Sequence, residues 1–294
     1  MNPLVSILIP VYNRELIVGE TIESAINQTY TNTEIIIVDN CSTDGTWGVL
    51  QNYAAKDRRI KIFQNAVNVG PVLNWKRCID EATGEYAKIL FSDDLISKNF
   101  IEETLAIFDE ETAFVLSSIK IFESDSEKDS SQKFDIKTVY AASLYLQDVL
   151  LNNFYGFPVS PGNSLFRSRD LKTSLIIDIP NTLNLNFQQY GAGNDLLLFL
   201  NTALRYSKIK TTKKAVAFFR SHKDSFSIAN KLNIYYDFSR LYFIEKHFPQ
   251  YLSKFKTLTW LRMKKLGKLN PIFSLAAGSH NWIYGIKFVF SKLL

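Results

Sequence analysis

The 294-residue chain has little cysteine and no apolar run long enough to cross a membrane. Its two cysteines, Cys41 and Cys78, cannot form a disulfide framework, and a cysteine-based zinc site needs about four ligands at short spacings. The longest uncharged run near the C-terminus, residues 269–286, contains a proline, glycines and several polar residues. A spanning helix needs roughly 20 mainly apolar residues. We therefore expect a protein with reduced thiols and no membrane-spanning helix.

No glycine-rich phosphate-binding motif occurs in the chain. The pattern G-x-x-x-x-G-K-[ST] is absent, which excludes a P-loop NTPase. The pattern G-x-G-x-x-G is absent as well, since Gly191-Ala192-Gly193 lacks the third glycine and does not follow the first strand-like run, so a Rossmann dehydrogenase is not expected. The N-terminus enters a strand-like run almost at once, without a basic region or a cleavage site. We expect no signal peptide and a cytoplasmic location.

Charge is unevenly distributed along the chain, whose formal net charge is +5. From residue 231 onward, 11 lysine and arginine residues stand against 2 acidic ones, a net charge of +9, whereas the preceding part has a net charge of −4. Aromatic residues such as Trp260, Trp282 and Phe288 are interleaved with these basic ones. Such a segment suits peripheral contact with an anionic membrane surface. The alternatives are a helical pair packed on the body of the protein and an interface in a homo-oligomer.

Strand-like and helical patterns alternate in the first hundred residues. Short apolar, β-branched runs predict strands at residues 4–10, 34–39, 60–64 and 86–91. Apolar residues at helical spacing predict helices at residues 15–27, 44–55 and 71–82. This order predicts an α/β fold with a Rossmann-like, mainly parallel sheet and helices on both of its faces.

Beyond residue 94 the pattern is less regular. We predict helices at residues 100–108, 141–151 and 194–206, strands at residues 113–122 and 208–220, and a loop that runs into a strand at residues 157–166. Residues 123–137 are polar and predict a surface loop. From about residue 228 the pattern is helical, with Pro249 and Pro271 as breakers, and predicts a C-terminal helical extension.

Polar and acidic residues follow three of the predicted strands. Asn13 follows the first strand, Asp39 ends the second, and Ser92, Asp93 and Asp94 follow the fourth. Each cluster alone is equally well explained as a turn or a helix cap. Because the carboxyl ends of parallel strands meet at one edge of a sheet, we expect the three clusters to lie together. Together they suit a nucleotide diphosphate bound with Mg²⁺ or Mn²⁺.

Four stretches of the chain resemble the inverting family 2 glycosyltransferases, which have the GT-A fold. The stretches are VSILIPVYNR (5–14), EIIIVDNCSTDGT (34–46), NVG (68–70) and GEYAKILFSDD (84–94), in the family's order and spacing. The resemblance covers roughly residues 3–225. It implies a nucleotide-sugar donor, a divalent metal (Mn²⁺ or Mg²⁺) and a sugar or lipid-linked acceptor. A subgroup of bacterial surface-polysaccharide transferases with S-D-D-L after this strand is similar, and Leu95 fits it.

The resemblance also implies individual site residues. Asp93 would ligate the metal, and Asp39 would bond the base of the nucleotide. The other contacts to the nucleotide-sugar would come from Pro10, Tyr12, Asn13, Asn68, Lys76, Ser92 and Asp94. Two positions depart from the family pattern, since Phe91 stands where a D-x-D triplet has its first aspartate, and Asn40 replaces a frequent second aspartate. With one carboxylate fewer, we expect weak metal binding in the absence of nucleotide.

The second half of the resemblance should supply the catalytic base. An inverting transfer is a single displacement in which one carboxylate takes the proton of the acceptor hydroxyl. The family has this base at the start of a helix about a hundred residues after the metal motif, and Asp195 fits that position. The alternative is an ordinary first-turn charge, favoured there by the helix dipole. His222 is a candidate for a metal or phosphate contact, against the alternative of a structural or surface histidine.

We therefore predict a catalytic domain at residues 1–225, with a nucleotide-binding half at 1–95 and an acceptor half at 96–225, and a basic, aromatic helical extension at 226–294. The predicted function is metal-dependent transfer of a sugar, with inversion, from a UDP-sugar to a glycan or a polyprenyl-diphosphate-linked acceptor. This reaction would serve surface polysaccharide synthesis at the inner face of the plasma membrane.

Two other functions fit the sequence less well. A nucleotidyltransferase would have a glycine-rich loop with Arg or Lys directly after the first strand, whereas this chain has PVYNRE there. A nucleic-acid-binding protein would have basic residues over the whole fold, whereas the first 230 residues are net acidic. No nucleic-acid partner is expected.

Overall fold

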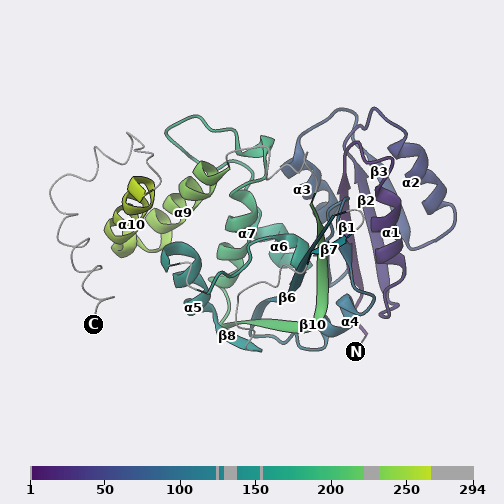
Figure 1. The fold of residues 1–294 in the computed structure, drawn as a ribbon. Coiled ribbons are helices and arrows are strands. Elements are labelled where there is room, and N and C mark those ends of the chain that lie inside the picture. Colours follow the sequence, from purple (N-terminus) through teal and green to yellow (C-terminus); the bar gives the residue numbers. More distant parts are fainter. Residues whose placement is uncertain (1, 124–125, 129–137, 153–154, 222–231, 266–294) are drawn as a thin grey trace.

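The computed structural model describes residues 2–123, 126–128, 138–152, 155–221 and 232–265 (Figure 1). Its strands are β1 (Val5–Val11), β2 (Thr33–Asp39), β3 (Ile60–Gln64), β4 (Tyr86–Ile89), β5 (Leu95–Ile96), β6 (Thr112–Glu123), β7 (Ser126–Lys128), β8 (Val139–Ala141), β9 (Ser164–Arg167) and β10 (Lys208–Arg220). They form one sheet in the order β3-β2-β1-β4-β9-β6-β10-β5, and β7 pairs with β6 and β8 with β10.

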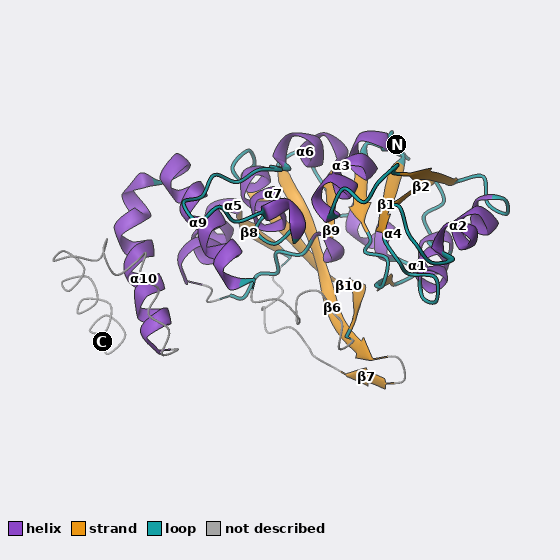
Figure 2. Cartoon of the chain, turned by 90° about the horizontal axis from the view of Figure 1, so that it is seen from above, coloured by secondary structure: helices purple, strands orange, loops and turns teal. Residues whose placement is uncertain are grey.

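The helices cover both faces of this sheet and extend beyond one end of it (Figures 1 and 2). The α-helices are α1 (Val18–Ile26), α2 (Thr46–Ala54), α3 (Pro71–Glu81), α4 (Phe100–Leu105), α5 (Ala142–Gln147), α6 (Ser168–Ser174), α7 (Asn194–Ala203), α9 (Asn233–His247) and α10 (Leu252–Lys265). A π-helical turn, η1 (Asp148–Asn152), continues α5, and 3₁₀ turns are η2 (Pro161–Asn163), η3 (Phe187–Gln189) and η4 (Pro249–Tyr251).

The N-terminal half of the sheet is parallel, as the alternating pattern predicts. β1 pairs in parallel with β2 and β4, and β2 pairs in parallel with β3. The register places Val11 beside Asp39 and Asp39 beside Gln64, so the carboxyl ends of these strands lie at one edge. The second half differs: β6 and β10 are parallel, but β9, β5, β7 and β8 pair antiparallel. The complete sheet is therefore mixed rather than mainly parallel.

Two cores lie on opposite faces of the sheet because alternate residues of each strand point in opposite directions. Ile7 and Ile9 of β1 pack with apolar residues of α1, α2 and α4, whereas Leu8 packs on the other face with residues of α3, α6 and α7. These side chains are fully buried, as expected for parallel strands covered on both sides. Cys78 of α3 belongs to the second core, and burial raises the pKa of its thiol, in line with a packing role.

Four short elements were missed by the sequence pattern. β5 and β8 have two and three residues, α6 has seven, and β7 lies inside the stretch predicted as a polar loop. Elements this short show no clear periodicity, and their pairing depends on strands distant in the chain. The rest of the predicted loop, residues 124–125 and 129–137, lies outside the described residues.

The predicted helical extension is confirmed for α9 and α10, which lie at the end of the sheet opposite α2 (Figures 1 and 2). Phe243 and Ile244 of α9 are fully buried in the same core as α7, and Phe255 of α10 joins them. The proposed boundary at residue 225 and the segment after residue 265 lie outside the described residues. Among the helices described, none has the length and apolar character needed to cross a bilayer.

Candidate active site

The loops after β1 and β2 are joined by hydrogen bonds at the carboxyl edge of the sheet. The Asn13 N–H donates to Ser42 Oγ (2.9 Å), and the Thr43 N–H donates to Asn13 Oδ1 (2.8 Å). Asn13 and Cys41 both adopt positive φ, 51° and 62°, a conformation uncommon outside glycine. Tyr12 is 40% exposed beside this junction, whereas Pro10 is buried within β1 next to Val38. Of the predicted pocket residues, Tyr12 and Asn13 therefore lie at the open edge and Pro10 lies beneath it.

Asp39 ends β2 in a fully buried position. Its carboxylate accepts hydrogen bonds from the Ser42 N–H (3.2 Å), from the Ser42 hydroxyl and from Gln64 Nε2 (2.8 Å). These partners come from the following loop and from the end of β3, so the carboxylate is fixed at the edge where the three strands end. Base recognition by Asp39 stays a prediction, since it needs acceptor capacity beyond these contacts.

A network of asparagines shapes the loop between β3 and α3. Asn40 Nδ2 donates to Asn68 Oδ1 (2.8 Å), while Asn40 Oδ1 accepts from the Val69 N–H (3.0 Å) and from Asn65 Nδ2 (2.9 Å). An aspartate at position 40 has no donor to offer to Asn68. The Asn40 amide therefore both donates and accepts hydrogen bonds here, which the aspartate frequent at this position could not do. This network places Asn68, a predicted nucleotide contact, next to the β2 loop.

The two carboxylates of the Ser92-Asp93-Asp94 turn lie in different surroundings, one partly exposed to solvent and one buried. The Asp93 side chain is 22% exposed, and its Oδ2 lies 3.5 Å from the Arg14 guanidinium. Asp94 is buried and turned inward, because its Oδ1 accepts the Arg220 N–H of β10 (3.0 Å). Burial and the neighbouring Asp93 raise the pKa of Asp94 well above its usual range. Of the three residues predicted on this turn, the expected metal ligand Asp93 faces outward. Asp94 and Ser92, the expected contacts to the nucleotide-sugar, are both buried, and Asp94 has a structural partner.

Two arginines at this turn were not predicted as site residues. Arg14, from the loop after β1, faces Asp93. The Arg220 guanidinium donates from Nε to the Asp93 carbonyl oxygen (3.0 Å) and forms an ion pair with Glu20 (2.6 Å). Arg14 belongs to the quoted VSILIPVYNR stretch, so the sequence carried a signal for it, whereas Arg220 lies more than a hundred residues away. His222, two residues beyond Arg220, lies outside the described residues.

Phe91 forms part of an apolar contact rather than a ligand set. Its ring lies 5.6 Å from that of Trp75, centroid to centroid. Trp75 of α3 in turn packs on Gly191, where a Cβ would lie 2.5 Å from the indole ring, and Gly191 adopts a φ of +68°. Only glycine fits this close approach of indole and backbone. Trp75 therefore connects the end of β4, two residues before Asp93, to the loop four residues before Asp195.

Asp195 lies in the first turn of α7, as predicted. Its Oδ1 accepts the Gly193 N–H (2.8 Å) and the Leu196 N–H (2.7 Å), and its Oδ2 accepts the Tyr236 hydroxyl (2.7 Å). These bonds lower the pKa of the carboxyl, but burial has the larger effect and raises the pKa of Asp195 to about 6. Burial therefore outweighs the hydrogen bonds of the helix start, although a group with this pKa is still ionised at neutral pH.

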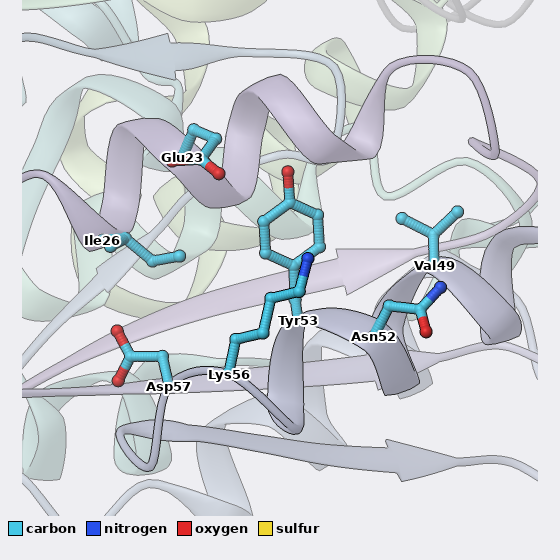
Figure 3. A pocket seen from close by; sticks show the side chains of 7 residues that line it. All are labelled: Glu23, Ile26, Val49, Asn52, Tyr53, Lys56 and Asp57. Carbon is cyan, nitrogen blue, oxygen red and sulfur yellow. The ribbon is translucent and has the colours of Figure 1, made fainter.

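Lys76, the last predicted contact to the nucleotide-sugar, has a partner on its own helix. It is exposed on α3 and forms an ion pair with Asp80, one helical turn further on. A separate pocket with a volume of ≈ 440 Å³ lies between α1 and α2 and is lined by Glu23, Ile26, Val49, Asn52, Tyr53, Lys56 and Asp57 (Figure 3). It involves the C-terminal half of α1, which runs back toward the amino ends of the strands. This pocket is therefore distinct from the strand-end site.

The residues at the turn fit a metal that is held together with a substrate. Within the described part of the chain, no three His, Cys, Asp or Glu side chains gather to enclose an ion. Mg²⁺ and Mn²⁺ need only one or two protein carboxylates when phosphate oxygens and water complete the octahedron. Asp93 supplies one outward-facing carboxylate to such a site.

Solved structures show that this architecture is the GT-A fold of glycosyltransferases. S. aureus TarS, residues 1–349 in complex with UDP-GlcNAc, superposes with a TM-score of 0.66 over 87% of this chain and 72% of that one, at 21% sequence identity. The model of glycosyl transferase family 2 matches residues 6–174, more than half of the chain. The chain belongs to this family, which confirms the resemblance and the predicted enzyme class.

Curated relatives in this family match over part of their length. A putative teichuronic acid biosynthesis glycosyltransferase, TuaG, of Bacillus subtilis (strain 168) is 38% identical over 35% of this chain and 41% of its own. A putative colanic acid biosynthesis glycosyl transferase, WcaA, of Escherichia coli (strain K12) is 39% identical over 36% of this chain and 38% of its own. The matched region therefore spans about two fifths of these relatives.

Proposed function

We propose that this protein is a metal-dependent inverting glycosyltransferase that moves a sugar from a nucleotide-sugar, most simply a UDP-sugar, to a glycan or a polyprenyl-diphosphate-linked acceptor in surface polysaccharide synthesis. One observation carries the proposal: Trp75 contacts Phe91 and Gly191, and two carboxylates with different environments, Asp93 and Asp195, follow these residues by two and four positions. Family membership speaks against the nucleotidyltransferase and nucleic-acid-binding alternatives.

The two carboxylates suit the two tasks of a single displacement. Asp93 is partly exposed beside Arg14, where it would hold a divalent cation together with the donor diphosphate. Such a cation would supply charge stabilisation to the departing diphosphate. Asp195 is buried and has a pKa of about 6, so at neutral pH it is ionised and basic enough to accept the proton of an acceptor hydroxyl.

The strand-end loops provide the surface for the nucleotide. Tyr12, Asn13 and Asp39 from β1 and β2 and Asn68 from the next loop lie around the edge where the parallel strands end. Nucleotides bind at this edge in open α/β sheets. The TarS structures with UDP-GlcNAc and with UDP support a uridine nucleotide as the first candidate.

A donor screen tests the proposal. We expect one nucleotide-sugar to raise the melting temperature of the protein, and to be hydrolysed slowly, only when Mn²⁺ or Mg²⁺ is present, because the ligand completes a site that the protein alone leaves with one outward carboxylate. The measurement is a thermal-shift series over UDP-, GDP-, CDP- and dTDP-sugars with metal or EDTA. Stabilisation by nucleotides that is the same in EDTA would contradict the metal dependence.

The basic C-terminal segment is proposed to bind the membrane surface. Truncation after residue 265 removes three of the basic residues and Trp282 but leaves α9 and α10 intact. We expect the truncated protein to bind anionic vesicles more weakly and to keep its donor hydrolysis. Salt should weaken the binding of the full chain, since exposed charges are screened over about 8–10 Å at physiological ionic strength. Vesicle sedimentation at low and high salt measures this, and salt-insensitive binding would favour an interface between subunits instead.

A further inference from the structure

Helix α9, which lies outside the family-matched residues, reaches the carboxylate that we propose as the base. The Tyr236 hydroxyl donates to Asp195 Oδ2 at 2.7 Å, while two backbone N–H groups of the α7 start hold Oδ1. Each oxygen of the carboxylate is thus fixed from a different side. A carboxylate oxygen has two acceptor positions, so Oδ2 keeps room for one more donor, such as an acceptor hydroxyl.

The contact between α9 and the α7 start is close along the backbone as well. A Cβ on Gly193 would lie 2.1 Å from Ser239 Oγ and 3.0 Å from the Tyr235 carbonyl oxygen, and Gly193 adopts a φ of +89°. Glycine at this position is what allows α9 to pack against the first turn of α7. The Ser239 side chain is fully buried in this contact. The position of Tyr236 relative to Asp195 is therefore set by packing and not only by one hydrogen bond.

Other charged and titratable groups face Asp195 from the neighbouring elements. Tyr145 of α5 is fully buried, and its hydroxyl has no hydrogen-bond partner within the described residues. Burial raises the pKa of Tyr145, and the charges of Asp195 and of Asp148 in η1 act in the same direction. Arg240 of α9 donates from Nε to the Val149 carbonyl oxygen (2.9 Å), lies 3.6 Å from Asp237, and lowers the pKa of Asp195. Tyr236 is the one side chain in this group with a hydrogen bond to the Asp195 carboxylate.

We propose that Tyr236 is a positioning residue that orients the Asp195 carboxylate for proton transfer, so that helix α9 of the C-terminal extension is part of the catalytic site. The inference rests on the proposed function of Asp195. The extension then has a second role besides the proposed membrane contact. Removal of α9 would leave Asp195 without its side-chain hydrogen-bond partner.

The direction in which loss of the Tyr236 hydroxyl shifts the pKa of Asp195 follows from which group donates the hydrogen bond. A donor to the carboxylate stabilises the ionised form, and burial opposes it. Without the Tyr236 hydroxyl, the pKa of Asp195 rises above about 6. A base works only when it is ionised, so the acidic limb of the pH–rate profile moves to higher pH. A hydrogen bond to a charged group corresponds to a shift of about one to two pH units.

The test is the pH profile of kcat/KM for Tyr236→Phe, which keeps the ring and removes the donor. We expect the acidic limb to move up by about one pH unit, with most of the activity recovered at pH 8–9 and unchanged KM for the donor. Tyr235→Phe is the matched control, since its ring packs on Phe187 and Tyr190 and the Asp195 hydrogen bonds stay in place. If the acidic limb of Tyr236→Phe lies at the same pH as that of the wild type, the inference is wrong.

A second variant covers the case in which Tyr236→Phe does not fold. Incorporation of 3-fluorotyrosine at position 236 keeps the packing and makes the phenol a stronger donor, so the limb should move to lower pH; an unmoved limb counts against the inference. Failure of the proposed function is distinguished by Asp195→Asn. If that variant keeps its turnover, Asp195 is not the base; if it is inactive while both Tyr236 variants have the wild-type profile, only the role of Tyr236 is wrong.

Discussion

Replacing Asp93 by alanine is expected to abolish sugar transfer and metal-dependent nucleotide binding while the fold survives. Asp93 is the carboxylate of the turn after β4 that faces outward, whereas Asp94 is committed to the Arg220 N–H. With Asp93 gone, the turn offers no outward carboxylate to a cation. Charge stabilisation by a metal contributes several kcal/mol, which corresponds to a loss of more than about 100-fold in turnover. Calorimetric titration of the nucleotide with and without Mn²⁺, beside a turnover assay, measures both effects.

The control for this variant is Asp80→Ala, which removes an exposed carboxylate from α3 and its ion pair with Lys76. Surface ion pairs contribute about 0–1 kcal/mol, so neither variant should change the melting temperature by much. Asp80→Ala should keep wild-type turnover. Full activity of Asp93→Ala, or full activity of the wild type in excess EDTA, would show that the reaction does not depend on a metal held by this turn.

The N-terminal half of the fold was predictable because its signals are local. β1 and β2 are buried on both faces, so they appear in the sequence as continuous apolar runs. The residues that end them, such as Asp39, are then placed at one edge by the rule for parallel strands. β5 and β8, in contrast, form by antiparallel pairing with β10, more than sixty residues further along the chain. No local pattern encodes such pairings.

The direction of each site carboxylate was not predictable from the sequence. Asp93 and Asp94 are adjacent and chemically identical, and the choice between them is made by a backbone N–H of Arg220, 126 residues away. The same holds for Asp195: its place at a helix start is a local signal, but its partner Tyr236 is 41 residues further on. Burial by α5 and α9 then outweighs the helix start in setting its pKa. Placement on an element is thus a local property, whereas orientation and pKa depend on tertiary packing.

Asp195→Asn is expected to lower transfer by about 10²–10⁴-fold, the range of general base catalysis. The amide keeps the shape, and its oxygen can still accept the Gly193 and Leu196 N–H groups. Its Nδ2 then faces the Tyr236 hydroxyl, which can turn to accept from it, but the amide cannot take a proton. Binding of nucleotide and metal should barely change, which separates this variant from Asp93→Ala. In the wild type, kcat/KM should fall as the pH drops through about 6, because the carboxyl becomes protonated there. The pH profile and calorimetric binding of the nucleotide are measured together.

The neighbouring Asn194 is not a suitable control for Asp195→Asn. It is fully buried, and its Nδ2 donates to the carbonyl oxygens of Ile176 (2.7 Å) and Ile177 (2.9 Å), so its loss would disturb the loop before α7. Asp178→Asn is the better control, because it makes the same chemical change at an exposed carboxylate of that loop. It should keep wild-type turnover. If Asp195→Asn retains more than about a tenth of the wild-type turnover, its loss of activity is smaller than the roughly 100-fold minimum expected for a general base. The base is then another group.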